Sequence, residues 1–195
     1  MIDYISGKIA ESTPTYVVID CGGVGYGLCV SLTTYSAING QDNAKLLVHE
    51  AIREDAYVLY GFATAVEREM FRMLISVSGV GANTARVILS AYPVLELQRA
   101  IASEDVKAIS SVKGIGAKTA QRLIVELKEK VMKLGVDLGE NISAVVDNKV
   151  REDALEALEV LGFNKQAAAK MVDKLLKDNP QMAVEVVVKN AIKLL

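Results

Sequence analysis

Short apolar runs separated by turn residues characterise the chain between residues 4 and 62. The runs read YISGKIAE, YVVIDCGG, VGYGLCVSLT, LLVHEAI and AYVLYGF. Runs of this length that are rich in β-branched and aromatic residues are typical of strands. Five such strands predict a small closed or partly open barrel, with an OB-like fold as the leading candidate.

The period of the apolar positions changes to that of a helix from residue 65 onward. Met70, Leu74 and Val77 lie on one stripe, and the helical pattern continues to about residue 134 with an interruption at Pro93. Residues 135–149, GVDLGENISAVVDNK, lose this periodicity and are rich in Gly, Asn, Asp and Ser. That composition is typical of a flexible linker, so a domain boundary is expected there.

Three short helices are predicted after the linker, in residues 150–195. The apolar stripe of the first helix stops at Gly162, a residue that takes the left-handed conformation at a helix end at little cost. Asn164 is suited to cap the second helix, and Asn179 with Pro180 to begin the third. The fold class is therefore multidomain, β then α: an OB-like barrel, a central helical domain and a C-terminal three-helix bundle.

Composition narrows the class of protein further. With 51% hydrophobic and 24% charged residues, the chain is unlike a disordered protein. It has neither an apolar run long enough for a membrane helix nor a signal peptide at its N-terminus, so a cytoplasmic location is expected. Cys21 and Cys29 lie in apolar strand-like sequence and are expected to be reduced thiols. They form no convincing metal site with His49, and we expect neither a metal nor a cofactor.

The net charge of −2 conceals a segregation along the chain. Residues 1–62 carry three basic and seven acidic residues, whereas residues 107–149 carry eight basic and five acidic residues. The intervening stretch is nearly balanced, and residues 150–195 have no net charge. An anionic partner is therefore expected at residues 107–149.

An internal repeat lies in the central segment. GVGANTA at residues 79–85 recurs as GIGAKTA at residues 114–120, with five of the seven positions identical. Each copy lies between helical stretches, which predicts a helix, a tight hairpin and a second helix. Neither copy has the third small residue of G-x-G-x-x-G or the spacing of a Walker loop, so no ATP site is expected.

The glycines of this repeat suit a DNA-binding role. We expect both glycines of each hairpin to let the backbone turn through positive φ and approach another backbone closely. The free N–H groups at the start of the following helix, with its dipole, favour a phosphate. Such contacts bind DNA without reading its sequence. The predicted DNA-binding residues are Gly79, Val80, Gly81, Asn83, Thr84, Gly114, Ile115, Gly116, Lys118, Thr119 and Arg122.

The two hairpins differ in charge. Lys118 and Arg122 add cations beside the amides of the second hairpin, whereas Asn83 and Val87 occupy the equivalent positions of the first. The first hairpin is therefore expected to bind through its amides alone and to grip DNA less tightly.

Several motifs resemble those of the RuvA family of tandem helix-hairpin-helix proteins. They occur in the order of that family and cover essentially the whole chain: GGVGYG at 22–27, REDA at 53–56, LYGF at 59–62, SGVG at 78–81, KGIGAKTAQRLIVELK at 113–128 and ALEVLGF at 157–163. The resemblance implies a non-catalytic subunit that binds four-way (Holliday) junction DNA in recombination and repair. It also implies a homotetramer, single or paired, and partnership with the hexameric ATPase RuvB, and it allows the resolvase RuvC as a further partner.

The resemblance assigns a role to each segment. Residues 1–63 would form the OB-like barrel and assemble the tetramer, with Glu54 and Asp55 as an acidic pin that repels phosphates at the crossover. Residues 64–134 would bind DNA, residues 135–149 would be the linker, and residues 150–195 would form a UBA-like bundle that contacts the motor. Leu161 and Phe163 are our candidates for that contact, although both suit a core position equally well.

Two other functions fit part of the pattern. A nuclease or base-excision glycosylase can contain the same hairpin, but it needs catalytic residues, and only Glu126 and Glu129 follow the second hairpin on an amphipathic helix. A single-strand binder could use the six barrel tyrosines for stacking, but the acidic balance of that segment opposes a phosphate-tracking groove. A single-strand binder would prefer single strands over four-way junctions, and a binding comparison would show this.

Overall fold

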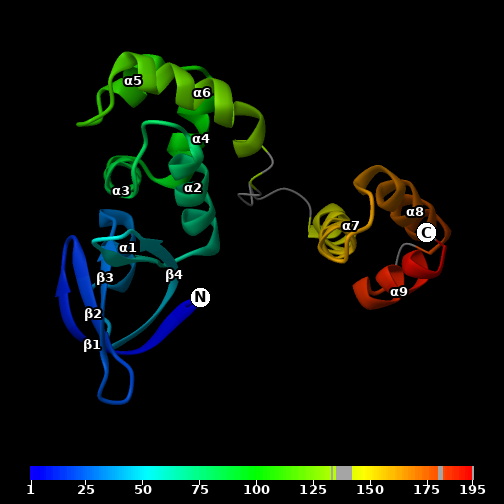
Figure 1. Cartoon of the computed structure of the whole chain (residues 1–195), viewed down its shortest axis with the longest axis horizontal. Coiled ribbons are helices and arrows are strands. Elements are labelled where there is room, and N and C mark those ends of the chain that lie inside the picture. The colour runs from blue at the N-terminus through cyan, green and yellow to red at the C-terminus, as the bar shows by residue number, and fades with distance from the viewer. Residues whose placement is uncertain (133, 135–141, 180–181, 195) are drawn as a thin grey trace. The chain divides into compact units, whose positions relative to one another are not determined.

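A computed structural model describes residues 1–132, 134, 142–179 and 182–194, with the backbone alone for residues 142–149 and 193. The chain forms two compact units, Met1–Val136 and Asp137–Leu195 (Figure 1). We call them the N-terminal and C-terminal units.

The N-terminal unit begins with a closed five-stranded barrel, which confirms the OB-like prediction. Its strands are β1 (Tyr4–Thr13), β2 (Tyr16–Asp20), β3 (Gly25–Val30), β4 (Asn43–Ile52) and β5 (Tyr57–Phe62). Their order is β1-β2-β3-β5-β4, closed by antiparallel pairing of β1 with β4; β3 and β5 are parallel. A helix that the sequence pattern did not predict, α1 (Leu32–Ile38), lies between β3 and β4, where the side chain of Ser31 caps its N-terminus.

Side chains along the strands alternate between the inside and the outside of the barrel, and the inward ones fill its interior. Val17 and Ile19 on β2, Leu46 on β4 and Leu28 on β3 are fully buried, each within a strand whose neighbouring residues are less buried. This is the pattern expected where one face of a strand packs inward. The last strand has a second role, because Tyr60 and Phe62 belong to the buried cluster of the helices that follow.

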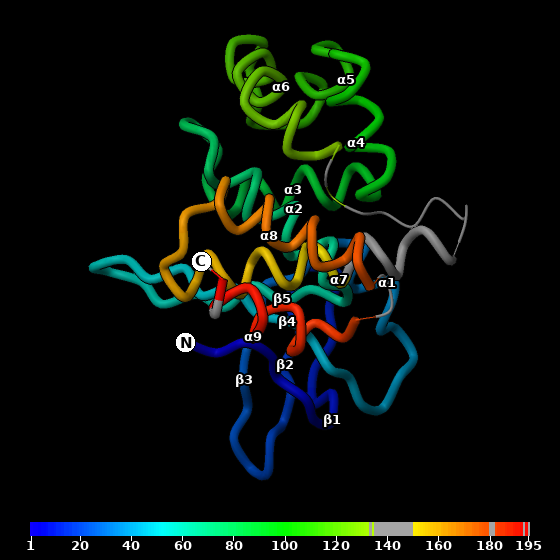
Figure 2. The backbone as a smooth tube through the Cα atoms, turned by 90° about the vertical axis from the view of Figure 1, so that its right-hand side faces the viewer, coloured from blue at the N-terminus to red at the C-terminus, as the bar shows by residue number. Residues whose placement is uncertain are grey.

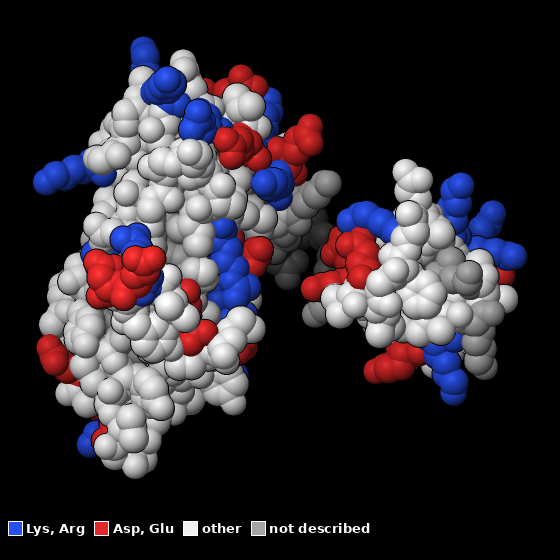
Figure 3. Space-filling view, in the orientation of Figure 1, with Lys and Arg blue, Asp and Glu red and all other residues white. Residues whose placement is uncertain are grey.

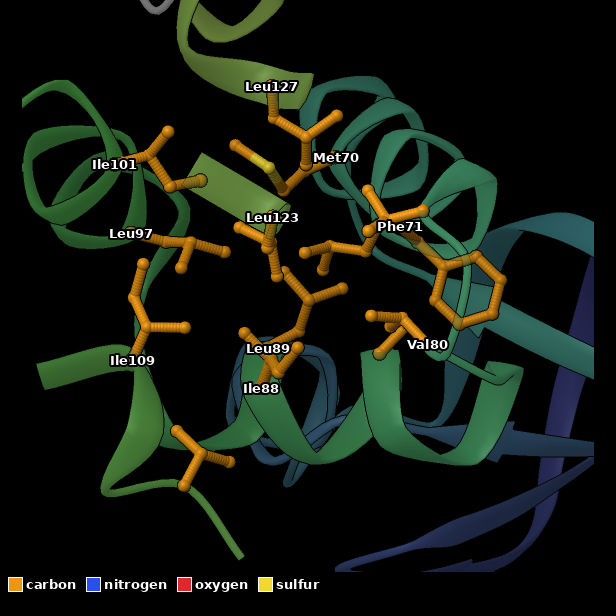
Figure 4. Packing of buried hydrophobic residues seen from close by; sticks show 14 of the residues in the cluster. Met70, Phe71, Val80, Ile88, Leu89, Leu97, Ile101, Ile109, Leu123 and Leu127 are labelled. Carbon is orange, nitrogen blue, oxygen red and sulfur yellow. The ribbon is translucent and has the colours of Figure 1, made fainter. Parts of the chain in front are cut away.

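Those helices are α2 (Ala65–Ser76), α3 (Ala82–Ala91), α4 (Val94–Ala102), α5 (Val106–Ser110) and α6 (Ala117–Val131). Figures 1 and 2 both show α5 and α6 at the end of this unit that lies away from the strands. Their core consists mainly of large aliphatic side chains, and Phe71 lies at its edge beside the strands (Figure 4). The barrel and these helices therefore share buried contacts and form one compact unit.

The helical segment also breaks at a place that its periodicity did not indicate, between α4 and α5. Glu104 there has φ of 58°, the left-handed region that side chains other than glycine seldom adopt. The N–H of Asp105 donates to the carbonyl of Ala100 at 2.9 Å, and the N–H of Glu104 to that of Ile101 at 3.2 Å. This is the Schellman arrangement, formed here without the usual glycine.

The C-terminal unit contains the three predicted helices, α7 (Ile142–Val160), α8 (Lys165–Asp178) and α9 (Val184–Leu194). Gly162 ends α7 with φ of 90°, and Asn164 caps α8 by accepting from the N–H groups of Gln166 and Ala167, as predicted. Small and apolar residues form its core: Ala154, Leu158, Ala168, Val172, Val187 and Ala191.

Two expectations for this part of the chain need correction. The structure makes residues 142–149 helical, whereas the sequence placed them in a linker; residues 135–141 of that range lie outside the described residues. Asn179 ends α8, its N–H donating to the carbonyl of Leu175, and α9 begins only at Val184, so Asn179 does not cap the third helix. Pro180 lies outside the described residues.

Candidate nucleic-acid interface

Each copy of the repeat forms a hairpin with the same backbone. The first glycine has positive φ in both, 93° at Gly79 and 92° at Gly114. The apolar residue after it points inward: Val80 and Ile115 are each 5% exposed. Their N–H groups donate across the turn, to the carbonyls of Val77 at 3.0 Å and Val112 at 3.1 Å. The middle residue of each motif therefore anchors the hairpin in the core.

The second glycine has another role than the one predicted. Gly81 and Gly116 have φ of −83° and −81°, so neither turns the chain through positive φ. Each is instead the N-cap residue of the helix that follows, α3 or α6, and no side chain caps either helix. A Cβ built at either position would meet no atom within 4 Å. The second glycine thus leaves the first-turn amides open on their outer side.

Open amides at a helix start form an anion site for two reasons. The first-turn N–H groups have no partner within their own helix, and the helix dipole places partial positive charge at the same end. Oxygen atoms of a phosphate accept from such groups without contact to a base. Both hairpins have this geometry, so both helix starts are candidate phosphate sites.

The two hairpins lie beside one another. The guanidinium of Arg122, on α6 of the second copy, donates to the carbonyl of Ser78 in the first at 3.4 Å. A Cβ at Gly79 would lie 3.9 Å from both Oγ1 and Cγ2 of Thr119. Arg122 also approaches Glu126 at 3.9 Å. The structure therefore gives Arg122 a part in joining the hairpins and places Thr119 beside Gly79, neither of which the sequence indicated.

Exposed lysines surround the second hairpin. Lys118 is exposed at the start of α6, as predicted, and Lys107 and Lys113 are exposed beside it. Figure 3 shows Lys and Arg side chains at the end of the N-terminal unit that contains α5 and α6. Lys107 and Lys113 were not predicted as single DNA-binding residues, although the excess of positive charge in residues 107–149 could have pointed to them.

The first hairpin has a different polar environment. Asn83 accepts at Oδ1 from the guanidinium of Arg86 at 2.9 Å. Thr84 is half-buried in the first turn of α3. The sequence analysis did not include Arg86, because nothing in the repeat marks that position.

The candidate acidic residues lie in the turn between β4 and β5. Glu54 and Asp55 are both exposed there, and the N–H of Arg53 donates to the carbonyl of Ala56 at 2.8 Å, which closes the turn. The hydroxyl of Tyr57 donates to Glu50 at 2.5 Å and lowers the pKa of that carboxyl. The turn thus presents two carboxylates to solvent, and hydrogen bonds between the ends of β4 and β5 hold it in place.

The two candidates for motor contact differ in exposure. Leu161 is 57% exposed, whereas Phe163 is partly buried and packs against the core of the C-terminal unit. The N–H of Phe163 donates to the carbonyl of Leu158 at 3.0 Å, and that of Gly162 to Glu159 at 3.0 Å. This closed helix end presents Leu161 outward.

Comparison with protein-family models finds three matches that together cover most of the chain. They are the RuvA N terminal domain at residues 1–61, a SAM-like helix-hairpin-helix tandem at residues 71–129 and the RuvA C-terminal domain at residues 149–195. Among curated proteins, the chain is 50% identical over 196 residues to the Holliday junction branch migration complex subunit RuvA of Parabacteroides distasonis, covering 100% of both chains. The chain belongs to the RuvA family.

Other RuvA proteins match to a similar extent. That of Bacteroides thetaiotaomicron is 51% identical over 199 residues, and that of Flavobacterium psychrophilum is 50% identical over 193 residues, each with 99% of both chains covered. The RuvA N terminal domain matches the residues of the barrel, and the helix-hairpin-helix tandem spans both hairpins. The RuvA C-terminal domain matches the three helices after the first unit.

Little in the described residues of this RuvA-family chain suggests a metal-dependent reaction. Within those residues, no group of three or more His, Cys, Asp or Glu side chains could hold a metal ion. Glu126, a candidate under the nuclease alternative, pairs with Arg122. Cys21 and Cys29 are both free thiols.

Among the described residues, no helix is long and apolar enough to cross a membrane.

Proposed function

We propose that this protein binds four-way DNA junctions by their backbone phosphates, holds them open and recruits an ATP-driven motor that moves the branch point. The observation that carries the proposal is the pair of adjacent hairpins, each with a helix N-terminus that no side chain caps. Related proteins are named as subunits of the Holliday junction branch migration complex, which supports the same role here.

The grip on DNA comes from the two hairpins. First-turn amides of α3 and α6 donate to phosphate oxygens, and the other predicted residues of both motifs form this surface, whereas Val80 and Ile115 support it from the core. Lys113 and Lys118 add long-range positive charge at the second hairpin. Because phosphates carry no sequence information, binding depends on the shape of the DNA and on salt, and not on its base sequence.

Junction preference comes from the acidic turn. Glu54 and Asp55 present two carboxylates from the barrel, and several copies around a common axis would concentrate negative charge at the crossover. Repulsion of phosphates there keeps strands apart, while the hairpins hold the arms. The assembly we propose is a homotetramer, single or paired, formed through residues 1–63.

The C-terminal unit recruits the motor. We assign residues 150–195 to contact with RuvB, with the exposed Leu161 as the first candidate and the half-buried Phe163 as its support. The chain itself is non-catalytic, since neither glycine hairpin has the spacing of an ATP-binding loop. A cytoplasmic location and contact with the resolvase RuvC complete the proposal.

A binding comparison tests this function. The wild-type protein is titrated at matched salt against a four-way junction and against linear duplexes that contain the same arm sequences. A marked preference for the junction, retained when the arm sequences are shuffled, is expected. Equal affinity for junction and duplex would overturn the proposal.

A second assay separates the roles of the two units. Deletion of residues 150–195 should leave junction binding largely intact and abolish stimulation of ATP hydrolysis by the motor. ATP hydrolysis by the full chain without the motor would contradict the non-catalytic role.

A further inference from the structure

One face of α3 is directed at the barrel and begins at the first hairpin. Asn83, Arg86 and Ser90 follow one another along this face at spacings of three and four residues. The Nη1 of Arg86 donates to the carbonyl of Thr15 at 3.1 Å and to that of Val30 at 3.4 Å. Its Nη2 donates to Oδ1 of Asn83 at 2.9 Å. Arg86 therefore links the start of α3 to the turn between β1 and β2 and to the end of β3.

Further along α3 the attachment to the barrel continues. The N–H of Leu32 donates to Oγ of Ser90 at 3.1 Å, and the hydroxyl of Thr33 donates to the carbonyl of Leu89 at 2.9 Å. Both partners on the barrel side lie in α1, the helix inserted after β3. The second half of α3, from Arg86 to Ser90, is thus hydrogen-bonded to the barrel and to α1.

The other helix of the first hairpin is attached in the same way. Glu67, in the first turn of α2, is 2% exposed. It accepts from the hydroxyl of Ser31, and from that of Thr34 at 2.7 Å. Burial raises the pKa of this carboxyl, which the two hydroxyl donors oppose. We call these contacts of Glu67, Arg86, Leu89 and Ser90 with Thr15 and residues 30–34 the polar seam.

The second copy of the repeat lacks such a seam. At the positions equivalent to Asn83 and Arg86, 35 residues later, stand Lys118 and Gln121, and both are exposed. In the described part of the chain, neither α5 nor α6 makes a hydrogen bond to the barrel. At the position of Arg86, the repeat therefore turns a polar side chain toward the barrel in the first copy, whereas Gln121 in the second copy faces solvent.

We propose that Asn83 and Arg86 are positioning residues, which fix the amides of the first hairpin relative to the acidic turn of the barrel. This inference rests on the proposed function, in which the hairpins hold DNA and the turn at residues 53–56 repels it at the crossover. A junction must fit the hairpin amides and the acidic turn at the same time, so junction affinity depends on the relative position of these two surfaces. Linear duplex can bind a hairpin without approaching the turn, so duplex affinity does not depend on that position.

The contacts of Arg86 distinguish this role from that of a phosphate ligand. Its guanidinium is held by three oxygen atoms of the protein itself, from Thr15, Val30 and Asn83. Its Nε is buried, and within the described residues it has no partner. An arginine held in this way contributes to the geometry of the hairpin. By contrast, each cation that binds a phosphate adds about one unit to the salt dependence of binding.

The test compares Arg86→Gln with Arg99→Gln, a control that removes the same charge from an exposed position on α4. Glutamine is the residue that the second copy carries at this position. Affinities for junction and duplex are measured over a salt series. We expect Arg86→Gln to lower the ratio of junction to duplex affinity about tenfold, the order expected for lost hydrogen bonds of a charged donor. Duplex affinity and salt slope should stay those of the control.

One further variant and one structural measurement sharpen the test. Arg86→Lys should restore part of the ratio by donating to the barrel carbonyls. Hydrogen exchange of the full chain should rise in Arg86→Gln over residues 79–90, with residues 114–125 unchanged.

The outcomes separate the two levels of the proposal. Wild-type protein without junction preference would overturn the proposed function, and the positioning role with it. A wild-type preference that Arg86→Gln retained would overturn the positioning role alone. Equal loss of affinity for junction and duplex, with a salt slope lower by about one, would make Arg86 a phosphate ligand. That result would also overturn the positioning role.

Discussion

The two glycines of the second hairpin should have separable effects when each is replaced by alanine. Gly114 has φ of 92°, whereas Gly116 has φ of −81° at the N-cap of α6. A Cβ at either position would meet no atom within 4 Å. Steric overlap with the rest of the fold therefore cannot explain a difference between the two variants. Any difference must come from backbone strain or from contact of the new methyl group with DNA.

Strain decides the expected effect on stability. A residue with a side chain in a sparsely populated positive-φ region costs on the order of 1–3 kcal/mol, so Gly114→Ala should destabilise the protein by about 2 kcal/mol. For a unit of this size, that lowers Tm by about 6 °C. Gly116→Ala imposes no strain. Alanine is a poorer N-cap than glycine by roughly 0.5–1 kcal/mol, and the stiffer unfolded chain offsets this loss by about 0.4–1 kcal/mol. Its Tm should change by less than about 1 °C.

Binding should follow the opposite order. The methyl group of Gly116→Ala lies beside the open first-turn amides of α6, where we expect a phosphate. Loss of one hydrogen bond to a charged group costs about 1.5–3 kcal/mol, so junction affinity should fall about tenfold or more. When binding is measured well below the Tm of Gly114→Ala, this variant should bind the junction more tightly than Gly116→Ala.

Thermal unfolding and junction titration at one protein concentration measure both effects. Gly81→Ala, the equivalent change in the first hairpin, serves as the matched variant because Gly81 has the same backbone and the same open side. If Gly116→Ala binds like wild type, the amides at this helix start are not the phosphate site. If Gly114→Ala melts like wild type, positive φ does not explain the glycine.

Three further changes should have distinct signatures. Lys118→Ala should weaken junction and duplex binding alike and lower the salt slope by about one, whereas Lys165→Ala on α8 should change neither; a selective loss for the junction would refute this. Glu54→Gln with Asp55→Asn should keep or raise duplex affinity and reduce junction preference, because repulsion at the crossover is removed; unchanged preference in a competition assay would count against the acidic turn. Glu104→Gly should raise Tm by about 3 °C. Relief of left-handed strain of about 1–2 kcal/mol exceeds the loss of the exposed ion pair between Glu104 and Lys128, which is worth at most about 1 kcal/mol. A lower Tm would count against this reasoning.

Local signals in the sequence were sufficient for much of the fold. The strands of the barrel follow short apolar runs, and the end of α7 at Gly162 and the cap at Asn164 follow from single residues with strong conformational preferences. The hairpins were recognisable because the repeat places glycine where positive φ is needed, at Gly79 and Gly114. Such features depend on neighbours in sequence, which a pattern can reveal.

Other features depend on contacts between distant segments. The helix α1 is short, and its polar residues find their partners on α2 and α3. No periodic apolar pattern therefore marked it in the sequence. Glu104 adopts a glycine-like conformation that no sequence rule assigns to glutamate. The partners of Arg86 are backbone carbonyls 71 and 56 residues away in sequence. Neither periodicity nor a motif contains that information.

The stoichiometry of the complex with a synthetic four-way junction tests the central claim most directly. Native mass spectrometry of the full chain, with the junction and with a linear duplex of the same arm sequence, counts the protein copies bound to each DNA. A junction complex with four copies, or with eight as two tetramers, alongside weaker and irregular loading of the duplex, is the result we predict. One or two copies per junction, or the same loading on both DNAs, would contradict the account.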